Sequence, residues 1–196
     1  MNDDQAVLKD TEQRRSLSPA AWDEYEALGL VGPEREGRTG MQGLDPVPDR
    51  KLIPKRAICA PDALNEAYDY ALPSSFSRGM RVDLPGATLL LLSGTASVDG
   101  TGATVHPGDF EAQLLRTFRN LTQLLVAEGA SWHDVVRTSC YLRDIERDYD
   151  RFNELRTSFM SAIGLDPLPA STGIQARICR SDLLVEIEAM AIVPRG

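Results

Sequence analysis

The chain has 196 residues, of which 42% are hydrophobic and 26% charged, and its formal net charge at pH 7 is −8. This length allows one ordinary hydrophobic core with an appended segment, and the negative charge repels a phosphate backbone, which argues against nucleic acid as a partner. No apolar run reaches the roughly 18 residues of a membrane span and the start lacks the basic and apolar blocks of a secretory signal, so we expect a cytoplasmic protein that does not bind membranes.

Residues 1–72 read as an N-terminal arm with one short helix. Ser18 suits the N-cap of that helix, Pro19 its first position, and Gly29 its stop. Residues 32–56 are dense in Gly, Pro and charge, which favours an extended arm or mobile linker over a second core. We therefore place a domain boundary between residues 72 and 73.

Residues 73–196 show the periodicities of a compact domain. Apolar residues form a nearly continuous run in a predicted buried strand that leads into a turn at Ser93 and Gly94, and they recur at helical spacing between the N-cap Asp109 and the stop at Gly129. In chain order the predicted elements are a strand at 87–98, a helix at 110–128, a strand at 134–142, a helix at 147–164 and strands at 171–178 and 183–193. This order predicts an α+β domain with two helices on one face of a sheet, whose other face is buried by another subunit.

The last predicted strand carries two carboxylates, Glu186 and Glu188, on the face opposite its apolar residues. Alternation alone fits a strand with one face in water, where acidic residues need no function. The three cysteines, Cys59, Cys140 and Cys179, are odd in number and lack CxxC spacing, so we expect free thiols and no metal site.

Several stretches of the domain resemble the Rid family, also called YjgF. They are SGTASV at 93–98, the run GDFEAQ to YLRD at 108–144, FNELRTSF at 152–159 and LLVEIEAMA at 183–191, in the family's order and spacing. The resemblance implies a fold like trimeric chorismate mutase and a homotrimer with small-molecule clefts between subunits. It also implies hydrolysis of imines and enamines to ketoacids and ammonia, without a cofactor.

The resemblance also assigns site residues. Glu186 corresponds to the glutamate that positions water, and we take it as the catalytic residue. Asn153, Gly94 and Phe76 correspond to residues of the cleft, although the family's aromatic is usually a tyrosine and Phe76 lacks that hydroxyl. The arginine of the family's PARS motif, which grips the substrate carboxylate, is replaced by Ala170. We therefore expect an atypical substrate, because a methyl group cannot supply a bidentate guanidinium grip.

Two other arginines are candidates to bind the substrate carboxylate in place of the absent one. Arg177 falls in the predicted strand 171–178, and Arg78 follows Phe76 closely. Backbone N–H groups around Thr172 offer another anion site, as nests do. The competing interpretation of either arginine is a solvated side chain paired with an acid.

Three other functions compete with the imine hydrolase. The words SGTAS and HPGD, at 93–97 and 106–109, also resemble the C-terminal half of chorismatases, which implies an enol-ether hydrolase. Loss of the arginine and the tyrosine hydroxyl fits a non-catalytic small-molecule-binding or regulatory trimer. A ribonuclease is disfavoured by the net charge of −8. His106 reads as a loop residue, with a proton-shuttle role as the alternative.

Overall fold

The structure is a computed structural model that describes residues 17–28, 30, 51–71 and 73–195. The chain divides into two compact units, Met1–Leu52 and Ile53–Gly196. In the first unit, helix α2 (Pro19–Ala27) has the predicted N-cap, since the Ser18 side chain accepts a hydrogen bond from the Ala21 N–H at 3.2 Å. The predicted stop at Gly29 and the stretch 31–50 of the predicted arm lie outside the described residues.

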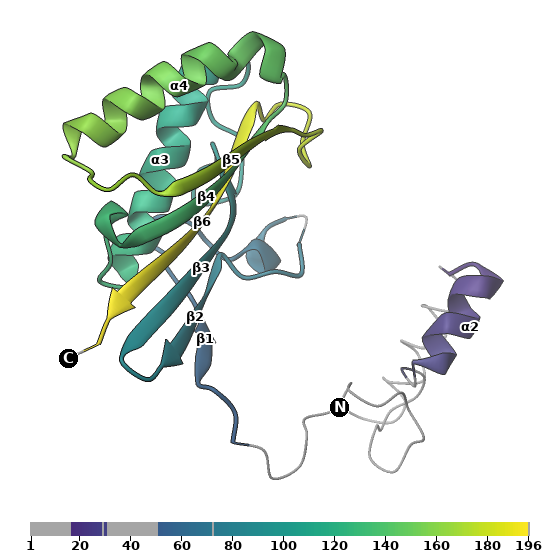
Figure 1. Ribbon diagram of the computed structural model, residues 1–196. Helices are drawn as coiled ribbons and strands as arrows, with labels where there is room; N and C mark the ends of the chain where they lie inside the picture. Colours follow the sequence, from purple (N-terminus) through teal and green to yellow (C-terminus); the bar gives the residue numbers. More distant parts are fainter. Residues whose placement is uncertain (1–16, 29, 31–50, 72, 196) are drawn as a thin grey trace. The chain divides into compact units, whose positions relative to one another are not determined.

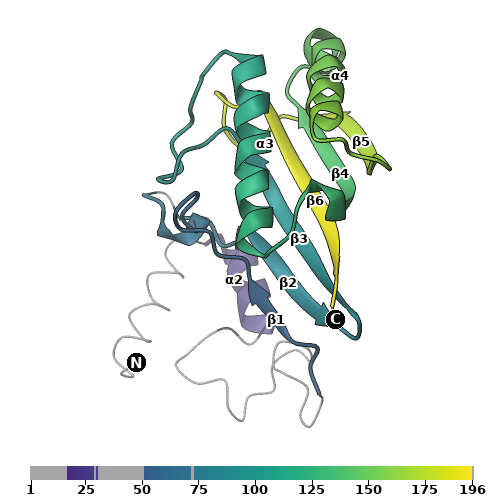
Figure 2. The same ribbon diagram turned by 90° about the vertical axis from the view of Figure 1, so that its left-hand side faces the viewer.

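The second unit is a six-stranded sheet in the order β1-β2-β3-β6-β4-β5, with two long helices on one face (Figures 1 and 2). All neighbouring strands are antiparallel except β4 and β5, which are parallel and joined through α4. The strands are β1 (Lys55–Ala57), β2 (Gly79–Leu84), β3 (Ala87–Ala96), β4 (Val135–Leu142), β5 (Ala170–Gln175) and β6 (Val185–Pro194). The helices are α3 (Phe110–Ala127) and α4 (Ile145–Ala162), with short 3-10 turns at Ala67–Asp69 and Trp132–Asp134. The predicted α+β fold is confirmed.

The core lies between the sheet and the two helices. Asp109 caps α3 by accepting from the Ala112 N–H at 3.0 Å, and the inward face of α3 carries fully buried Leu114, Leu121 and Leu125. In β6 the odd-numbered residues 185, 187, 189 and 191 are buried against the helices, as the alternation predicted. Glu186 and Glu188 therefore lie on the open face of the sheet.

Three features differ from the sequence-based expectations. Strand β2 was not predicted, because its sequence GMRVDL is half-buried along most of its length and shows no contrast between faces. Strand β1 was not predicted either, because it is only three residues long and mostly exposed. The compact unit begins at Ile53, before the expected boundary at 72/73, because Ile58 and Leu64 are fully buried in the core.

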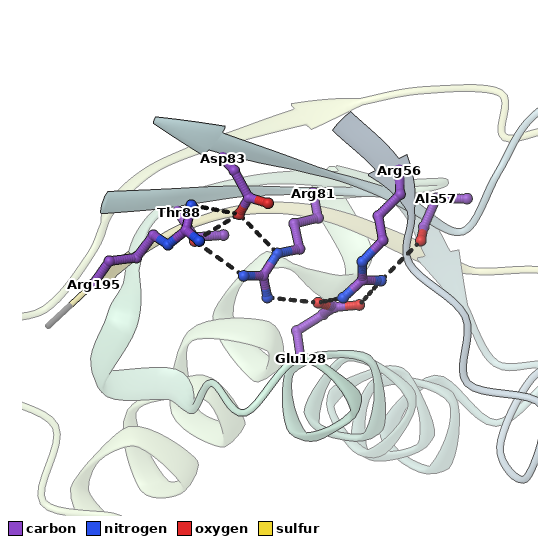
Figure 3. Close-up of polar contacts among 7 residues, drawn as sticks. All are labelled: Arg56, Ala57, Arg81, Asp83, Thr88, Glu128 and Arg195. Carbon is purple, nitrogen blue, oxygen red and sulfur yellow. Dashed lines mark hydrogen bonds and ion pairs between the residues drawn. The ribbon is translucent and has the colours of Figure 1, made fainter. Parts of the chain in front are cut away.

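A cluster of charged side chains attaches β1 to the rest of the unit (Figure 3). Glu128, which follows α3 and whose side chain is only 1% exposed, accepts two bonds from Arg56 of β1, at 2.8 and 2.7 Å, and a third from Arg81 of β2 at 3.2 Å. Arg81 also pairs with Asp83, which Arg195 approaches to 3.4 Å. The cluster thus links β1, β2 and the residue after β6 to the C-terminal end of α3.

A search for membrane-spanning segments covered the described residues and found no helix with the length and hydropathy that a bilayer crossing requires.

Candidate active site

The site begins with an irregularity in the pairing of β3 with β6. Leu92 pairs with Ala189 and Thr95 with Ile187, so β3 advances three residues while β6 advances two. The extra residue forms a β-bulge at Ser93 and Gly94. The Ser93 hydroxyl donates to the Ser77 carbonyl at 2.8 Å, and the Thr95 hydroxyl donates to the Ser93 carbonyl at 2.9 Å. These bonds hold the bulge in place beside Glu186, the partner of Ala96.

The bulge places the backbone of Gly94 directly against the Glu186 side chain. A Cβ atom on residue 94 would lie 2.0 Å from Oε1 of Glu186 and 2.9 Å from its Cδ. No side chain larger than hydrogen fits there unless the carboxylate moves. Gly94 is therefore needed for close approach to the carboxylate rather than for a turn.

Glu186 lines a cavity of about 130 Å³ that the chain forms on its own. Two of the predicted substrate-binding residues, Gly94 and Phe76, line the same cavity, as does Arg78. The remaining lining residues are Ala67, Tyr70, Ser74, Ala96, Val98, Cys179, Arg180 and Leu183. The structure thus brings together four residues that the sequence analysis named as site candidates and adds further polar ones, among them Tyr70 and Arg180.

The surroundings of Glu186 favour its protonated form. Burial raises the pKa of its carboxyl group above the usual value, the neighbouring Glu188 raises this pKa further, and Arg180 opposes the shift. Glu188 itself accepts a hydrogen bond from the Tyr141 hydroxyl at 2.8 Å. The two glutamates therefore differ: Glu188 has a structural partner on β4, whereas Glu186 faces the cavity as a potential proton donor and acceptor.

Arg78 directly precedes β2, and it lines the cavity. It is 5% exposed, its Nε donates to the Asn65 carbonyl at 3.0 Å, and its Nη2 donates to the Tyr70 hydroxyl. Its Cζ lies 4.8 Å from the ring centre of Tyr70 and 5.5 Å from that of Phe76. Phe76 thus helps to hold this guanidinium, and the hydroxyl that Phe76 lacks is present on Tyr70.

Arg180 reaches the cavity from the loop between β5 and β6. The Arg143 guanidinium donates to the carbonyls of Arg180 and Leu183, and the buried Gln113 amide donates to the Asp182 carbonyl at 2.8 Å. Arg180 in turn donates to the Gly102 carbonyl. The buried Gln113 of α3 and the half-buried Arg143, which follows β4, therefore hold this loop in place.

Three predicted substrate-binding residues lie elsewhere in the chain. Asn153 is on α4, where its Oδ1 accepts from Arg156 at 2.6 Å. Thr172 is on β5, where its hydroxyl accepts from Arg137 at 3.2 Å. Arg177 was expected within a strand, but β5 ends at Gln175 and Ile178 has a φ of 47°, so Arg177 lies exposed in the following loop. None of the three lines the cavity around Glu186.

The position of the missing arginine also needs a correction. Set letter by letter on Pro169–Thr172, the motif PARS puts its arginine at Ser171 and not at Ala170. Neither residue is charged, so the conclusion that the arginine is absent is unchanged. The Ser171 hydroxyl accepts from the Arg156 guanidinium at 3.1 Å, and Ala170 is exposed.

His106 has a backbone role at the start of α3. Its φ is 59°, and its carbonyl accepts from the Asp109 N–H at 3.2 Å and from the Gln113 amide at 3.1 Å. Its side chain is exposed and does not line the cavity. Within the described ranges, no group of three or more His, Cys, Asp or Glu residues is arranged to hold a metal ion.

Comparisons with known proteins agree with this fold. Residues 72–193 match the family model described as Endoribonuclease L-PSP. A RutC family protein of Pyrococcus abyssi is 28% identical over 102 residues, which are 52% of this chain and 76% of that protein. The 2-iminobutanoate/2-iminopropanoate deaminase of Mus musculus is 26% identical over 117 residues, 60% of this chain and 80% of the deaminase.

Solved structures show the same likeness over about seven tenths of this chain. The YjgF gene product of E. coli superposes with a TM-score of 0.57 and 26% identity, covering 71% of this chain and 99% of that one. E. coli TdcF with bound serine gives a TM-score of 0.57 at 25% identity, over 72% of this chain and 99% of that one. Since the family model covers more than half of the sequence, the chain belongs to the Endoribonuclease L-PSP family, also known as YjgF or Rid.

Proposed function

We propose that this protein hydrolyses small imines or enamines without a cofactor, with Glu186 as the group that handles protons. The observation that carries this proposal is the position of Glu186: its carboxylate lies against Gly94, in a small cavity, with a raised pKa. A carboxyl group whose pKa is raised holds its proton more readily than an exposed one, which suits it to donate as well as to accept a proton. The mouse relative's name, 2-iminobutanoate/2-iminopropanoate deaminase, supports the same reaction class.

The proposed reaction needs one proton relay. The imine reacts as its protonated form, the iminium. Water adds to the carbon while Glu186 takes one proton from this water, which gives a neutral carbinolamine. Glu186 then returns this proton to the nitrogen. The C–N bond breaks with its electrons on nitrogen while Glu186 takes the hydroxyl proton, so that a C=O bond forms. Ammonia leaves, accepts that proton from Glu186, and the carboxylate is regenerated. Iminium and water are thus converted to ketone and ammonium, with no net oxidation or reduction.

The proposal includes a homotrimer in which neighbouring copies complete each site. Large apolar side chains are exposed on the strands of the sheet, among them Leu91 (36%), Ile174 (46%) and Ile192 (47%). A surface of this kind favours contact with another copy. Asn153, Thr172 and Arg177 would then belong to the cleft from a neighbouring subunit. Light scattering should give a mass of about three chains, and a monodisperse monomer would leave those three residues outside any site.

Replacement of Glu186 by glutamine tests the catalytic role. Glu186→Gln keeps the shape and the hydrogen-bonding atoms but removes the proton-accepting carboxylate, so turnover should fall about 10²-fold or more. Glu188→Gln is the matched control, because Glu188 bonds to Tyr141 and does not line the cavity. The assay measures ammonia and 2-oxo acid release from a panel of freshly generated imines, with chorismate and RNA as further substrates.

The panel also separates the competing functions. Equal rates for wild type and Glu186→Gln on a true substrate would refute the catalytic assignment and favour a small-molecule-binding trimer. Turnover of chorismate would favour the enol-ether hydrolase, which stays a prediction from the sequence. The family description names an endoribonuclease, but the net charge of −8 opposes binding to an RNA backbone, and we expect no RNA cleavage.

A further inference from the structure

Arg78 is a buried cation without an acidic partner. Its side chain is 5% exposed, and the hydrogen-bond acceptors of its guanidinium, the Asn65 carbonyl and the Tyr70 hydroxyl, are both neutral. Glu66 accepts from the backbone N–H of Arg78 at 3.2 Å, but no ion pair joins a carboxylate to the Arg78 guanidinium within the described part of the chain. Burial of an unpaired charge is costly, so such an arrangement points to an anion that is bound during function.

Arg78 lines the cavity, and its bonds leave part of its guanidinium without an acceptor. Nε and Nη2 are occupied, while Nη1 has no acceptor among the residues described. The rings of Tyr70 and Phe76, at 4.8 and 5.5 Å, fix the plane of the group. A guanidinium whose plane is held before binding loses little entropy when it receives a carboxylate.

Arg180 adds a second positive charge to the same cavity. Its guanidinium bonds to the Gly102 carbonyl, again a neutral acceptor, and it is close enough to Tyr70 and Glu186 to lower the pKa of both. The cavity wall therefore carries two guanidinium groups and one carboxyl group, Glu186. Burial nevertheless leaves the pKa of Tyr70 raised overall, so its hydroxyl keeps a proton that it can donate to a bound anion.

We infer that Arg78 and Arg180 together bind the carboxylate of a small substrate, in place of the arginine that is absent at residue 171. The substrates are then small 2-imino or 2-enamino carboxylates, and the product is a 2-oxo acid. This inference rests on the proposed function for the reaction at Glu186, but the anion site itself is defined by residues of a single chain. Tyr70 acts as a positioning residue, because its hydroxyl accepts from Arg78.

A binding experiment on the full-length protein tests the site without requiring turnover. Calorimetric titration should show that pyruvate binds and that its uncharged methyl ester does not. Arg78→Gln and Arg180→Gln should each weaken pyruvate binding by about 10- to 100-fold, the range expected when a charged hydrogen bond is lost. Arg119→Gln is the matched control, since Arg119 is exposed on α3 and away from the cavity, and it should bind like the wild type.

The outcomes for the inference and for the proposed function are distinguishable. Glu186→Gln should keep pyruvate binding while losing turnover. Loss of turnover in Glu186→Gln with unchanged pyruvate binding in both arginine variants would overturn the anion site and leave the proposed function standing. Weakened pyruvate binding in the arginine variants with full turnover in Glu186→Gln would support the anion site and refute the proposed role of Glu186.

If Arg78→Gln does not fold, the Arg180→Gln variant alone decides the test, because Arg180 is only half-buried in a loop. Equal affinity for pyruvate and its ester in the wild type would also overturn the inference.

Discussion

Substitution of Gly94 by alanine displaces the proposed catalytic carboxylate without touching Glu186 itself. The new Cβ would lie 2.0 Å from Oε1 of Glu186, and ordinary contact begins at 3.4 Å, so the carboxylate must move by at least 3.4 − 2.0 = 1.4 Å. A misplacement of about 1 Å in a catalytic group can cost about 10²-fold in rate. We therefore expect Gly94→Ala to lose about 10²-fold in imine hydrolysis.

The fold should tolerate this substitution. Gly94 does not have the positive φ that excludes alanine, and the atom nearest to the new Cβ is the end of a flexible side chain. The midpoint of urea unfolding should therefore stay close to that of the wild type. Gly100→Ala is the matched control, because its Cβ would meet nothing closer than the Ala63 carbonyl at 3.8 Å and residue 100 does not line the cavity.

A double-mutant cycle makes the test decisive. If Gly94 acts only by leaving room for Glu186, the double variant Gly94→Ala/Glu186→Gln should have the same residual rate as Glu186→Gln alone. A folded Gly94→Ala protein with the wild-type rate would refute the reasoning, because it would show that the position of this carboxylate does not matter for the chemistry.

Two further predictions concern stability. The folded state favours the protonated form of Glu186, so the contribution of this group to the free energy of unfolding is complete below the usual pKa of 4.5 and is lost as the pH rises through the raised folded-state pKa. Glutamine does not titrate, so the stability of Glu186→Gln relative to the wild type should increase from acid to neutral pH. Urea unfolding at several pH values measures this gain, and a pH-independent difference would contradict it. Ile58→Ala, at a fully buried position before the family-matched region, should cost about 2–5 kcal/mol. The exposed control Val126→Ala should stay within about 0.5 kcal/mol in the same assay, and equal effects of both would place Ile58 outside the core.

The elements α3, β4, α4 and β6 were predictable because their apolar residues recur with a regular period, and β3 because its apolar run is nearly continuous. The helix that starts after Asp109 and the alternation around Glu186 are examples, and both have the expected buried faces. Strand β5 is exposed along its whole length, and its predicted end at residue 178 lies beyond the observed end at Gln175. Strand β2 was missed because Arg81 and Asp83 pair with each other on a half-buried strand, so buried apolar and exposed polar residues do not alternate along it. Strand β1 is held by pairing with β2 and by the contact of Arg56 with Glu128, two residues far apart in sequence.

The site was predictable only in part for a similar reason. Glu186, Gly94 and Phe76 follow from motifs, and the structure places all three on one cavity. Tyr70 and Arg180 come from loops whose positions depend on packing, so no period marks them. The contact of Tyr70 with Gly102 is visible only in the structure, where a φ of 83° and the close approach of the ring require a residue without a side chain.

The bulge in β3 reverses the parity of that strand. Before it, the even-numbered residues Thr88, Leu90 and Leu92 are buried, and after it Thr95 is the residue whose partner, Ile187, faces the helices. Deletion of Ser93 or Gly94 would remove the bulge and still leave Thr95 opposite Ile187, because β3 and β6 would then both advance by two residues. The buried side of the strand would therefore be kept. What would be lost is the backbone that lies against Glu186, so the extra residue serves the carboxylate and not the core.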